Sequence, residues 1–431
     1  MSNLPMTARS LAYELLQKAD RSKQYSNIAL DHALESSDLS NTDKRLASIL
    51  FYGVIERRLT LDYRISQLSS RSISELDAKV LCALRLGLYQ LMYLDRVPAH
   101  AAINETVALC PKKSSGFVNA ILRAHTRTEM TAPPREDEVR FLSLSYSVCE
   151  PLVKKFVDSY GVETTEDILR GFERSSDTTL RVNTLMTSRE ELSKRIDGSS
   201  YTQNSPVGLY AKGSVREMQG FDDGLFFVQD EASQICVEAL GGKSGELVLD
   251  ICSCPGSKSF GTAIKMANDG KIISFDLHEN KLSLVRSGAQ RLGINIIETR
   301  AADGRDGIPE LEGMADRVLC DVPCSGFGVL AKKPELRYKD PKESENLPKI
   351  QRAILDNACK YVKSDGVLVY STCTLLPEEN EKNIFAFLDD HPEFKLCPWQ
   401  VGDIDATEGY ITLLPHVHKT DGFFIAKLIR K

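Results

Sequence analysis

The chain lacks several patterns that would place it in a common class. No stretch is apolar over the length that a membrane span needs, and residues 1–6 have neither the basic start nor the apolar run of a signal peptide. We therefore expect a cytoplasmic protein without a membrane partner. No internal repeat or low-complexity tract is present either, and 431 residues exceed one ordinary core, so two or three domains are expected.

An excess of basic residues is also missing. The net charge of -6 and the pI near 5.8 argue against indiscriminate binding to nucleic acid, although they allow a local basic face. The 11 cysteines are odd in number and scattered, which indicates reduced thiols rather than a disulfide framework. Structural zinc sites usually space their cysteines as C-x2-4-C, and no histidine lies close to Cys252 and Cys254 or to Cys320 and Cys324, so no metal is expected.

The last 200 residues alternate strands with helices, and this pattern predicts a mostly parallel sheet. Strands are expected at residues 246–250, 271–276, 294–299, 315–321 and 366–372. The phosphate-binding patterns G-x-G-x-x-G and G-x-x-x-x-G-K-[ST] are absent. Acids instead follow the second and third strands, at Asp276 and Asp303, where a carboxylate can accept from ribose hydroxyls. The pattern therefore predicts a nucleoside without a pyrophosphate, and S-adenosylmethionine fits it. An Asp after a strand can also be a helix cap.

Two of the expected strands end near a cysteine. Cys373 follows the apolar run 366–372, and Asp321 with Cys324 follows 315–321. Because ligands bind at the carboxyl ends of strands in open α/β sheets, both thiols become candidate reactive groups. The alternative is that each is a buried, inert cysteine.

The first part of the chain shows a different periodicity. Residues 8–128 predict helices throughout, and apolar positions over 78–94 recur every three or four residues as in a helix buried in a bundle. The proline-rich stretch 131–137 indicates a domain boundary, and residues 138–225 mix helices with short strands.

Short motifs in the second half resemble those of RNA cytosine-C5 methyltransferases. Asp250–Lys258 resembles D-x-C-A-A-P-G-G-K, Asp321–Gly326 resembles D-A-P-C-S-G, and Ser371–Thr374 resembles S-T-C-S. Two segments of the helical part, 98–107 and 116–123, resemble the signature of the NusB-like RNA-binding domain. With 181–184, 229–233 and 422–424 added, the whole chain resembles the RsmB (Sun/Fmu) family of 16S ribosomal RNA methyltransferases.

The resemblance implies an α/β Rossmann-like class I methyltransferase domain with a mostly parallel sheet at residues 226–431. A small α+β domain at 138–225, which would position RNA, and an all-α NusB-like RNA-binding domain at 1–130 would precede it. The co-substrate would be S-adenosylmethionine. The expected partner is 16S ribosomal RNA, naked or in an early assembly intermediate, with no obligatory protein partner.

The resemblance also implies roles for individual residues. Cys373 would add to cytosine C6, Cys324 would assist product release, Asp321 would contact the N3/N4 edge of the base, and Lys258 would supply positive potential. The residues expected to bind the cofactor are Cys252, Ser253, Cys254, Pro255, Gly256, Ser257, Lys258, Asp276, Asp303 and Asp321. The turn departs from the family pattern because Ser253, Cys254 and Ser257 replace two alanines and a glycine, and Ser257 adds a Cβ where backbone approaches the cofactor.

Basic residues in two places are candidates for contacts with the RNA backbone. They are Lys112, Lys113, Arg123 and Arg127 in the helical part, and Lys332, Lys333, Arg337, Lys339 and Lys342 after Cys324. In both places a solvated surface is the alternative. Two other functions stay open at this point: a noncatalytic RNA-binding or ribosome assembly factor, and a cytosine-C5 methyltransferase that acts on transfer RNA.

Overall fold

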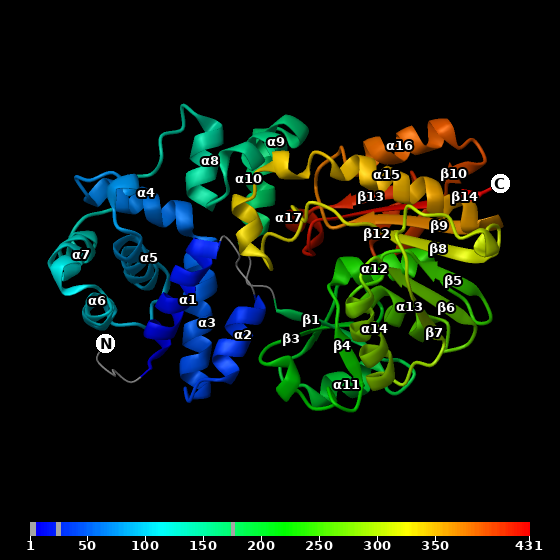
Figure 1. Cartoon of the computed structure of the whole chain (residues 1–431), viewed down its shortest axis with the longest axis horizontal. Helices are drawn as coiled ribbons and strands as arrows, with labels where there is room; N and C mark the ends of the chain where they lie inside the picture. The colour runs from blue at the N-terminus through cyan, green and yellow to red at the C-terminus, as the bar shows by residue number, and fades with distance from the viewer. Residues whose placement is uncertain (1–5, 23–26, 174–176) are drawn as a thin grey trace. The chain divides into compact units, whose positions relative to one another are not determined.

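The computed structural model describes residues 6–22, 27–173 and 177–431 (Figure 1). The chain forms two compact units: the first runs to Asp158 and includes Lys333–Asp340, and the second comprises Ser159–Lys332 and Pro341–Lys431. The expected domain boundaries at residues 130, 138 and 225 stay predictions. Residues 1–5, on which the expectation about a signal peptide partly rests, lie outside the described residues. Within those ranges, no helix has the length and apolar character needed to cross a membrane.

The first unit is helical, which confirms the prediction for the described residues of 8–128. Its helices are α1 (Ala8–Ser22), α2 (Asn27–Glu35), α3 (Asn41–Glu56), α4 (Arg58–Leu68), α5 (Ala78–Tyr93), α6 (Ala99–Ala108), α7 (Lys112–His125), α8 (Glu138–Tyr146), α9 (Glu150–Tyr160, whose last turn crosses the unit boundary), and the 3₁₀ helices η1 (Ile73–Glu75) and η4 (Pro334–Tyr338).

Helix α5 is the centre of this bundle. The side chain of Asp77 accepts a hydrogen bond from the backbone N–H of Lys79 and so caps the first turn. Val80, Leu84 and Leu88, four residues apart, are all buried on the face that packs against α1, α3, α6 and α7. The apolar periodicity of residues 78–94 therefore produces the buried helix that it predicts.

Segment η4 corrects one expectation about RNA contacts. Arg337 is fully buried: its Nη1 donates to the backbone oxygen of Tyr146 at 2.9 Å, and its Nη2 lies 3.5 Å from Glu56 Oε1. The neighbouring Tyr338 hydroxyl donates to the carbonyl oxygen of Ile55 at 2.6 Å. The prediction that Arg337 contacts RNA is wrong, because its guanidinium is used to fasten η4 to α3 and α8.

A small antiparallel sheet begins the strand-containing part of the second unit. Its strands are β1 (Thr178–Val182), β2 (Ser200–Tyr201), β3 (Gly208–Ala211) and β4 (Phe226–Val228), in the order β2-β3-β1-β4. Helix α11 (Arg189–Arg195) starts with a capping box formed by Ser188 and Glu191 and packs on β3. Leu180, Leu209 and Phe226 form the centre of the buried cluster between them.

The large sheet has the order β10-β14-β9-β8-β5-β6-β7, and β13 pairs with β14 beside this path. Strands β9, β8, β5, β6 and β7 are parallel, whereas β14 is antiparallel to β9. The strands are β5 (Leu247–Asp250), β6 (Lys271–Asp276), β7 (Ile297–Ala301), β8 (Ala315–Asp321), β9 (Val362–Thr372), β10 (Phe394–Leu396), β13 (Tyr410–Leu413) and β14 (Phe423–Arg430). The predicted fold class, a mostly parallel α/β sheet preceded by a small α+β part and a helical part, is confirmed.

Helices cover both faces of this sheet. Val248 points into an apolar cluster shared with α12 (Glu231–Leu240), α13 (Ser257–Lys265) and α14 (Glu279–Arg291). The next residue, Leu249, belongs to the cluster on the other face, with α15 (Leu347–Ala358) and α16 (Glu381–Asp390). This alternation is the two-residue period of a strand buried on both sides. The remaining elements are α10 (Val162–Gly171), β11 (Trp399–Val401), β12 (Ile404–Ala406), α17 (Pro415–His418), η2 (Val215–Glu217), η3 (Pro309–Leu311), η5 (Pro341–Ser344) and η6 (Cys359–Tyr361).

The predicted strand 271–276 coincides with β6, but β7 begins at Ile297 rather than at Ile294. Gly293 has a φ of +67° after α14, and the backbone N–H of Ile294 donates to the carbonyl oxygen of Ala289 at 2.9 Å. Ile294 therefore belongs to the helix end and not to the strand.

Candidate active site

The two candidate thiols meet at the carboxyl edge of the large sheet. Strands β8 and β9 are neighbours with Asp321 paired to Ser371, so the residues that follow each strand are brought together. Cys324 Sγ lies 3.1 Å from Cys373 Sγ, and the backbone N–H of Cys373 points to Cys324 Sγ at 3.3 Å. Neither cysteine is in a disulfide, and both are partly exposed. The two sulfurs are therefore close enough to act on the same bound molecule.

The pKa of the Cys324 thiol depends on its neighbour Cys373. The hydrogen bond with Cys373, followed by burial, raises the pKa of Cys324 well above its ordinary value. Cys324 thus keeps its proton at neutral pH, which suits a group that holds or transfers a proton rather than one that attacks.

A second network keeps the loops after β8 and β9 in register. Glu379 Oε2 accepts from the backbone N–H of Ser325 at 2.9 Å and from Gln351 Nε2 at 2.7 Å. The hydroxyls of Ser325 and Thr374 lie 2.7 Å apart. Sequence reasoning did not assign a role to Glu379, because the contacts join three segments far apart in the chain.

Lys258 and Asp321 form an ion pair beside the thiols. Lys258 Nζ lies 2.7 Å from Asp321 Oδ2, and Ser371 Oγ donates to Asp321 Oδ1 at 2.8 Å. Burial alone would lower the pKa of Lys258, but the charge of Asp321, together with the Cys236 and Cys373 thiols, raises that pKa above its ordinary value. Lys258 is therefore a stable cation in a site where its field reaches Cys373.

The turn 250–258 contains polar atoms without partners. Asp250 is buried and accepts from Ser259 Oγ at 2.6 Å through Oδ2, whereas its Oδ1 and the buried Ser253 Oγ have no hydrogen-bond partner among the described residues. Burial raises the pKa of Asp250 to about 7. Buried polar atoms normally have partners, so these orphaned atoms fit a turn that binds a polar ligand. Gly256, at φ +110°, precedes α13 and leaves no room for a Cβ, which would lie 2.5 Å from Phe260.

Asp276 and Asp303 lie side by side at the same sheet edge. Asp276 ends β6 and its Oδ1 accepts from the backbone N–H of His278 at 2.9 Å, while its carbonyl accepts from Ala302. Asp303 is held by Arg305, whose Nε lies 2.9 Å from Oδ1, and hydrogen bonds from Arg305 lower the pKa of Asp303 to about 2. Cys254 adjoins this pair: burial first, then a hydrogen bond with Asp276, raises its pKa to about 12. Cys252, largely buried, has a pKa raised by burial and by the neighbouring carboxylates.

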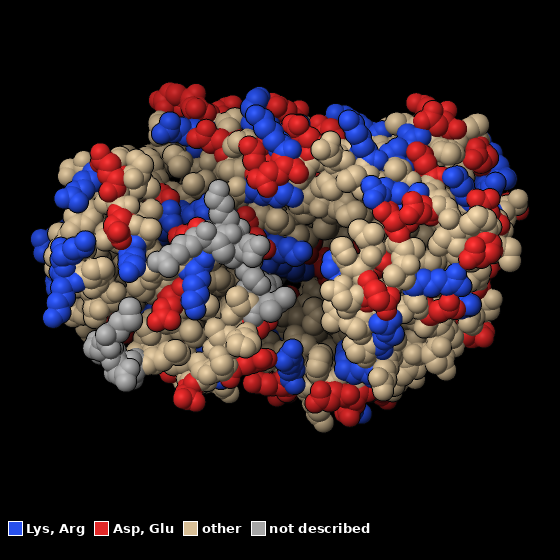
Figure 2. Space-filling model, in the orientation of Figure 1, with Lys and Arg blue, Asp and Glu red and all other residues tan. Residues whose placement is uncertain are grey.

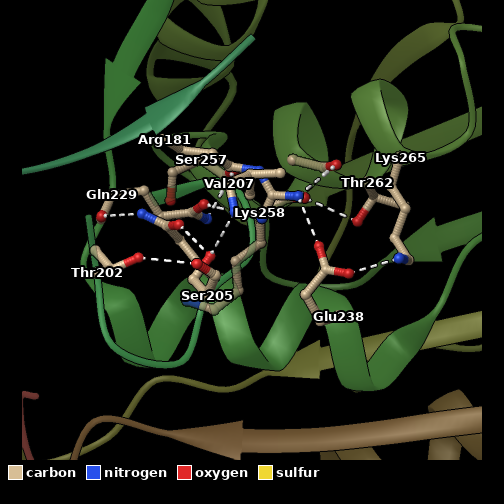
Figure 3. Close-up of polar contacts among 12 residues, drawn as sticks. Arg181, Thr202, Ser205, Val207, Gln229, Glu238, Ser257, Lys258, Thr262 and Lys265 are labelled. Carbon is tan, nitrogen blue, oxygen red and sulfur yellow. Dashed lines mark hydrogen bonds and ion pairs between the residues drawn. The ribbon is translucent and has the colours of Figure 1, made fainter. Parts of the chain in front are cut away.

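Two of the motif segments contact helix α12 and the start of α13, which follows the turn 250–258. Arg181, from β1, is buried and its Nη2 donates to Glu238 Oε1 at 3.1 Å (Figure 3). Gln229 Nε2 donates to the carbonyl oxygen of Ser257 at 3.0 Å, which fixes the start of α13 just before Lys258 (Figure 3). The motifs at 181–184 and 229–233 were the only signal for these residues, because nothing local in the sequence shows which distant backbone atom they contact.

The predicted basic residues of the helical part are exposed. Lys112, Lys113 and Arg123 lie on α7 and Arg127 follows it. Figure 2 shows Lys and Arg mixed with Asp and Glu over the face drawn, in agreement with the overall charge of -6. Contacts of these four residues with RNA stay a prediction. Across the residues that the structure describes, no group of three or more His, Cys, Asp or Glu side chains is arranged to hold a metal ion.

The chain matches two protein-family models. Residues 237–429 match the model "16S rRNA methyltransferase RsmB/F", and residues 6–127 match the NusB family. The probable ribosomal RNA small subunit methyltransferase B of Bacillus subtilis is 36% identical over 446 residues, which cover 99% of this chain and 99% of that protein. The protein of the same description from Synechocystis is 36% identical over 442 residues, which cover 98% of this chain and 99% of that protein.

A solved structure shows the same fold over the whole chain. The crystal structure of PH0851 superposes with a TM-score of 0.80 at 28% identity, and the match covers 99% of this chain and 100% of that one. The chain therefore belongs to the RsmB family of S-adenosylmethionine-dependent 16S rRNA (cytosine-C5)-methyltransferases, with a NusB domain at its N-terminus.

Proposed function

We propose that this protein methylates C5 of one cytosine in 16S ribosomal RNA through a covalent adduct between Cys373 and C6 of the base. The observation that carries the proposal is the pair of thiols 3.1 Å apart at the sheet edge, with the Lys258–Asp321 ion pair beside them. Cytosine C5 is a poor nucleophile until a thiolate adds to C6, so the reaction needs one sulfur that attacks and a group that manages the proton.

Each of the four residues at the site has its own role in this reaction. Cys373 attacks, and the cation Lys258 stabilises its thiolate. Asp321 contacts the N3/N4 edge of the base: it accepts from the amino group and, when protonated, donates to N3 and so offsets the negative charge that develops on the ring during attack. Cys324, whose pKa is raised, keeps its proton at neutral pH and assists elimination by donating a hydrogen bond to the Cys373 sulfur as it leaves. In that step the C5 proton passes to solvent, its electron pair re-forms the C5–C6 double bond, and the C6–S bond breaks to release the Cys373 thiolate.

S-adenosylmethionine, when bound, supplies the methyl group from its sulfonium centre. The residues proposed to hold it are those of the turn 252–258, with Asp276 and Asp303 at the next strand ends and Asp321 beside them. The orphaned Ser253 Oγ and Asp250 Oδ1 support this assignment, because both are buried polar atoms at the turn. Gln229 and Arg181 donate hydrogen bonds to carbonyl oxygens of α13, the helix that follows the turn.

Deletion of the gene tests the substrate. Bisulfite sequencing of 16S ribosomal RNA should show one cytosine that is protected from conversion in the parent strain and converted in the deletion strain. Restoration by the wild-type gene but not by a Cys373→Ala gene would tie the mark to the thiol. Protection that is lost from transfer RNA instead would show that the enzyme acts on transfer RNA.

A noncatalytic assembly factor predicts a different result. Such a protein would change ribosome assembly in the deletion strain without changing any 5-methylcytosine. It would also fail to bind labelled S-adenosylmethionine at millimolar concentration, whereas the proposed enzyme should bind it.

A further inference from the structure

The second unit, which carries the two thiols, also contains a cavity. None of the residues proposed for catalysis or for binding S-adenosylmethionine lines it. Its volume is about 440 Å³, within the range of small-ligand sites. Residues of the small sheet, of the loop 414–422 and of the segment after Cys324 surround it. The residues that matter for its chemistry are Tyr201, Asp230, Lys332, Lys419 and Asp421.

Two backbone hydrogen bonds connect a segment of the cavity lining to the backbone of Cys373. The N–H of Gly422 donates to the carbonyl oxygen of Gly328 at 2.8 Å, and the N–H of Gly328 donates to the carbonyl oxygen of Cys373 at 2.9 Å. A Cβ on Gly328 would lie 1.9 Å from the oxygen of Gly422, so the two segments touch through backbone alone. Asp421 directly precedes Gly422. Asp421, in the cavity lining, therefore lies near the same sheet edge as Cys373, just before the neighbouring strand β14.

The floor of the cavity carries fixed hydrogen-bond acceptors. Lys332 Nζ contacts Asp230 Oδ1 and lies 2.8 Å from Asp421 Oδ2, so one cation holds two carboxylates in place. Asp421 is buried, and Asp177 adds a third carboxylate to the lining. Burial, followed by the charge of Asp230, raises the pKa of Asp421 to about 7. A carboxyl group keeps an acceptor oxygen in either protonation state, so such a floor suits N–H donors.

The residues at the mouth of the cavity are aromatic and basic instead of acidic. Tyr201, on the edge strand β2, is 45% exposed, and the guanidinium of Arg189 lies 4.1 Å from the centre of its ring. Lys419 is exposed on the loop 414–422. An aromatic ring with two cations nearby is the arrangement on which an unpaired base stacks while its phosphate stays in solvent.

We propose that this cavity binds one unpaired nucleotide of the substrate RNA, the one next to the target cytosine, and that it prefers guanine there. The base would stack on Tyr201 and direct its Watson–Crick edge to Asp230 and Asp421. Guanine presents an imino and an amino N–H side by side, whereas uracil presents carbonyl oxygens on both sides of its N–H and would meet repulsion. The identification as RNA rests on the proposed function.

The test uses the full chain and single-stranded RNAs that contain one cytosine. The nucleotide on its 5′ or 3′ side is guanosine, uridine or an abasic residue, and both binding anisotropy and methylation are measured. The wild type should prefer guanosine over the abasic residue and over uridine on one of the two sides by at least about fivefold, as stacking of one base contributes. Tyr201→Ala should lose the preference over the abasic residue, and Asp421→Asn should reduce the preference over uridine.

Leu284→Ala is the matched control, since Leu284 is 55% exposed on α14 outside the cavity and should keep both preferences. Equal binding of all RNAs by the wild type, or an unchanged preference in Tyr201→Ala, would overturn the inference. A preference in binding with no methylation of any RNA would support the cavity and contradict the proposed function instead. Tyr201 lies on an exposed edge strand, so its variant tests recognition even if Asp421→Asn lowers stability.

Discussion

Burial of the Asp250 carboxyl makes the stability of the protein depend on pH. Its pKa is raised to about 7 in the fold, against about 3.9 in an unfolded chain, so the folded state holds the proton more tightly over this window. Stability should therefore fall as pH rises from 4 to 7, by up to about 1.4 kcal/mol per pH unit from this group. Asp250→Asn should remove that slope in urea unfolding at several pH values. An identical pH slope in variant and wild type would show that Asp250 does not titrate there.

Asp276 and Asp303 give a second prediction for single residues. Asp276→Ala and Asp303→Ala should each weaken binding of S-adenosylmethionine by about 10-fold or more, because each removes a charged acceptor at the sheet edge. RNA binding should stay nearly unchanged. Calorimetry measures both, with Asp405→Ala on the exposed β12 hairpin as control. Equal loss of both ligands would indicate damage to the fold.

Single residues also show what a sequence can and cannot predict. The meeting of Cys324 and Cys373 was predictable, since two apolar runs ending near cysteines become neighbouring strands whose carboxyl ends meet at one edge. The burial of Arg337 was not, because a lysine- and arginine-rich loop looks solvated until the helices that cover it are placed. The contacts of Glu379 and Gln229 were hidden for the same reason: each bonds to backbone that lies far away in sequence.

Among the elements, η4 gives the clearest prediction about stability. The Tyr338 hydroxyl donates to the carbonyl oxygen of Ile55 and accepts from the backbone N–H of Arg58 at 3.1 Å in a partly buried setting. Tyr338→Phe removes the hydrogen bonds that join η4 to Ile55 and Arg58, so unfolding of the first unit should become easier by about 1–3 kcal/mol. Urea unfolding monitored by circular dichroism measures this.

Tyr63→Phe is the control for η4. The Tyr63 hydroxyl makes one long contact, 3.4 Å to the carbonyl oxygen of Ala132, at an exposed position. A loss of stability as large in this variant would mean that the effect belongs to any tyrosine of the first unit and not to η4.

The net charge of the whole molecule is negative, so its affinity for RNA has to come from local groups of cations. Replacing Lys112, Lys113, Arg123 and Arg127 by Gln in the full chain should weaken RNA binding and reduce the slope of log K against log salt by up to about 3, at roughly 0.7 per lost phosphate contact. The control replaces four exposed lysines of other elements: Lys154, Lys360, Lys382 and Lys395. The same change of slope in both variants would show that α7 and Arg127 have no special part in RNA binding.

The order of the two thiol steps is the central claim, and a denaturing gel tests it most directly. Each variant is incubated with substrate RNA and S-adenosylmethionine. Cys324→Ala should attack and methylate but stall before release, and so accumulate a denaturant-resistant protein–RNA band. Cys373→Ala should give no band, and the double variant should behave like Cys373→Ala because release cannot matter without attack. A band from Cys373→Ala but not from Cys324→Ala would mean that the roles are exchanged, and no band from either would contradict the covalent mechanism.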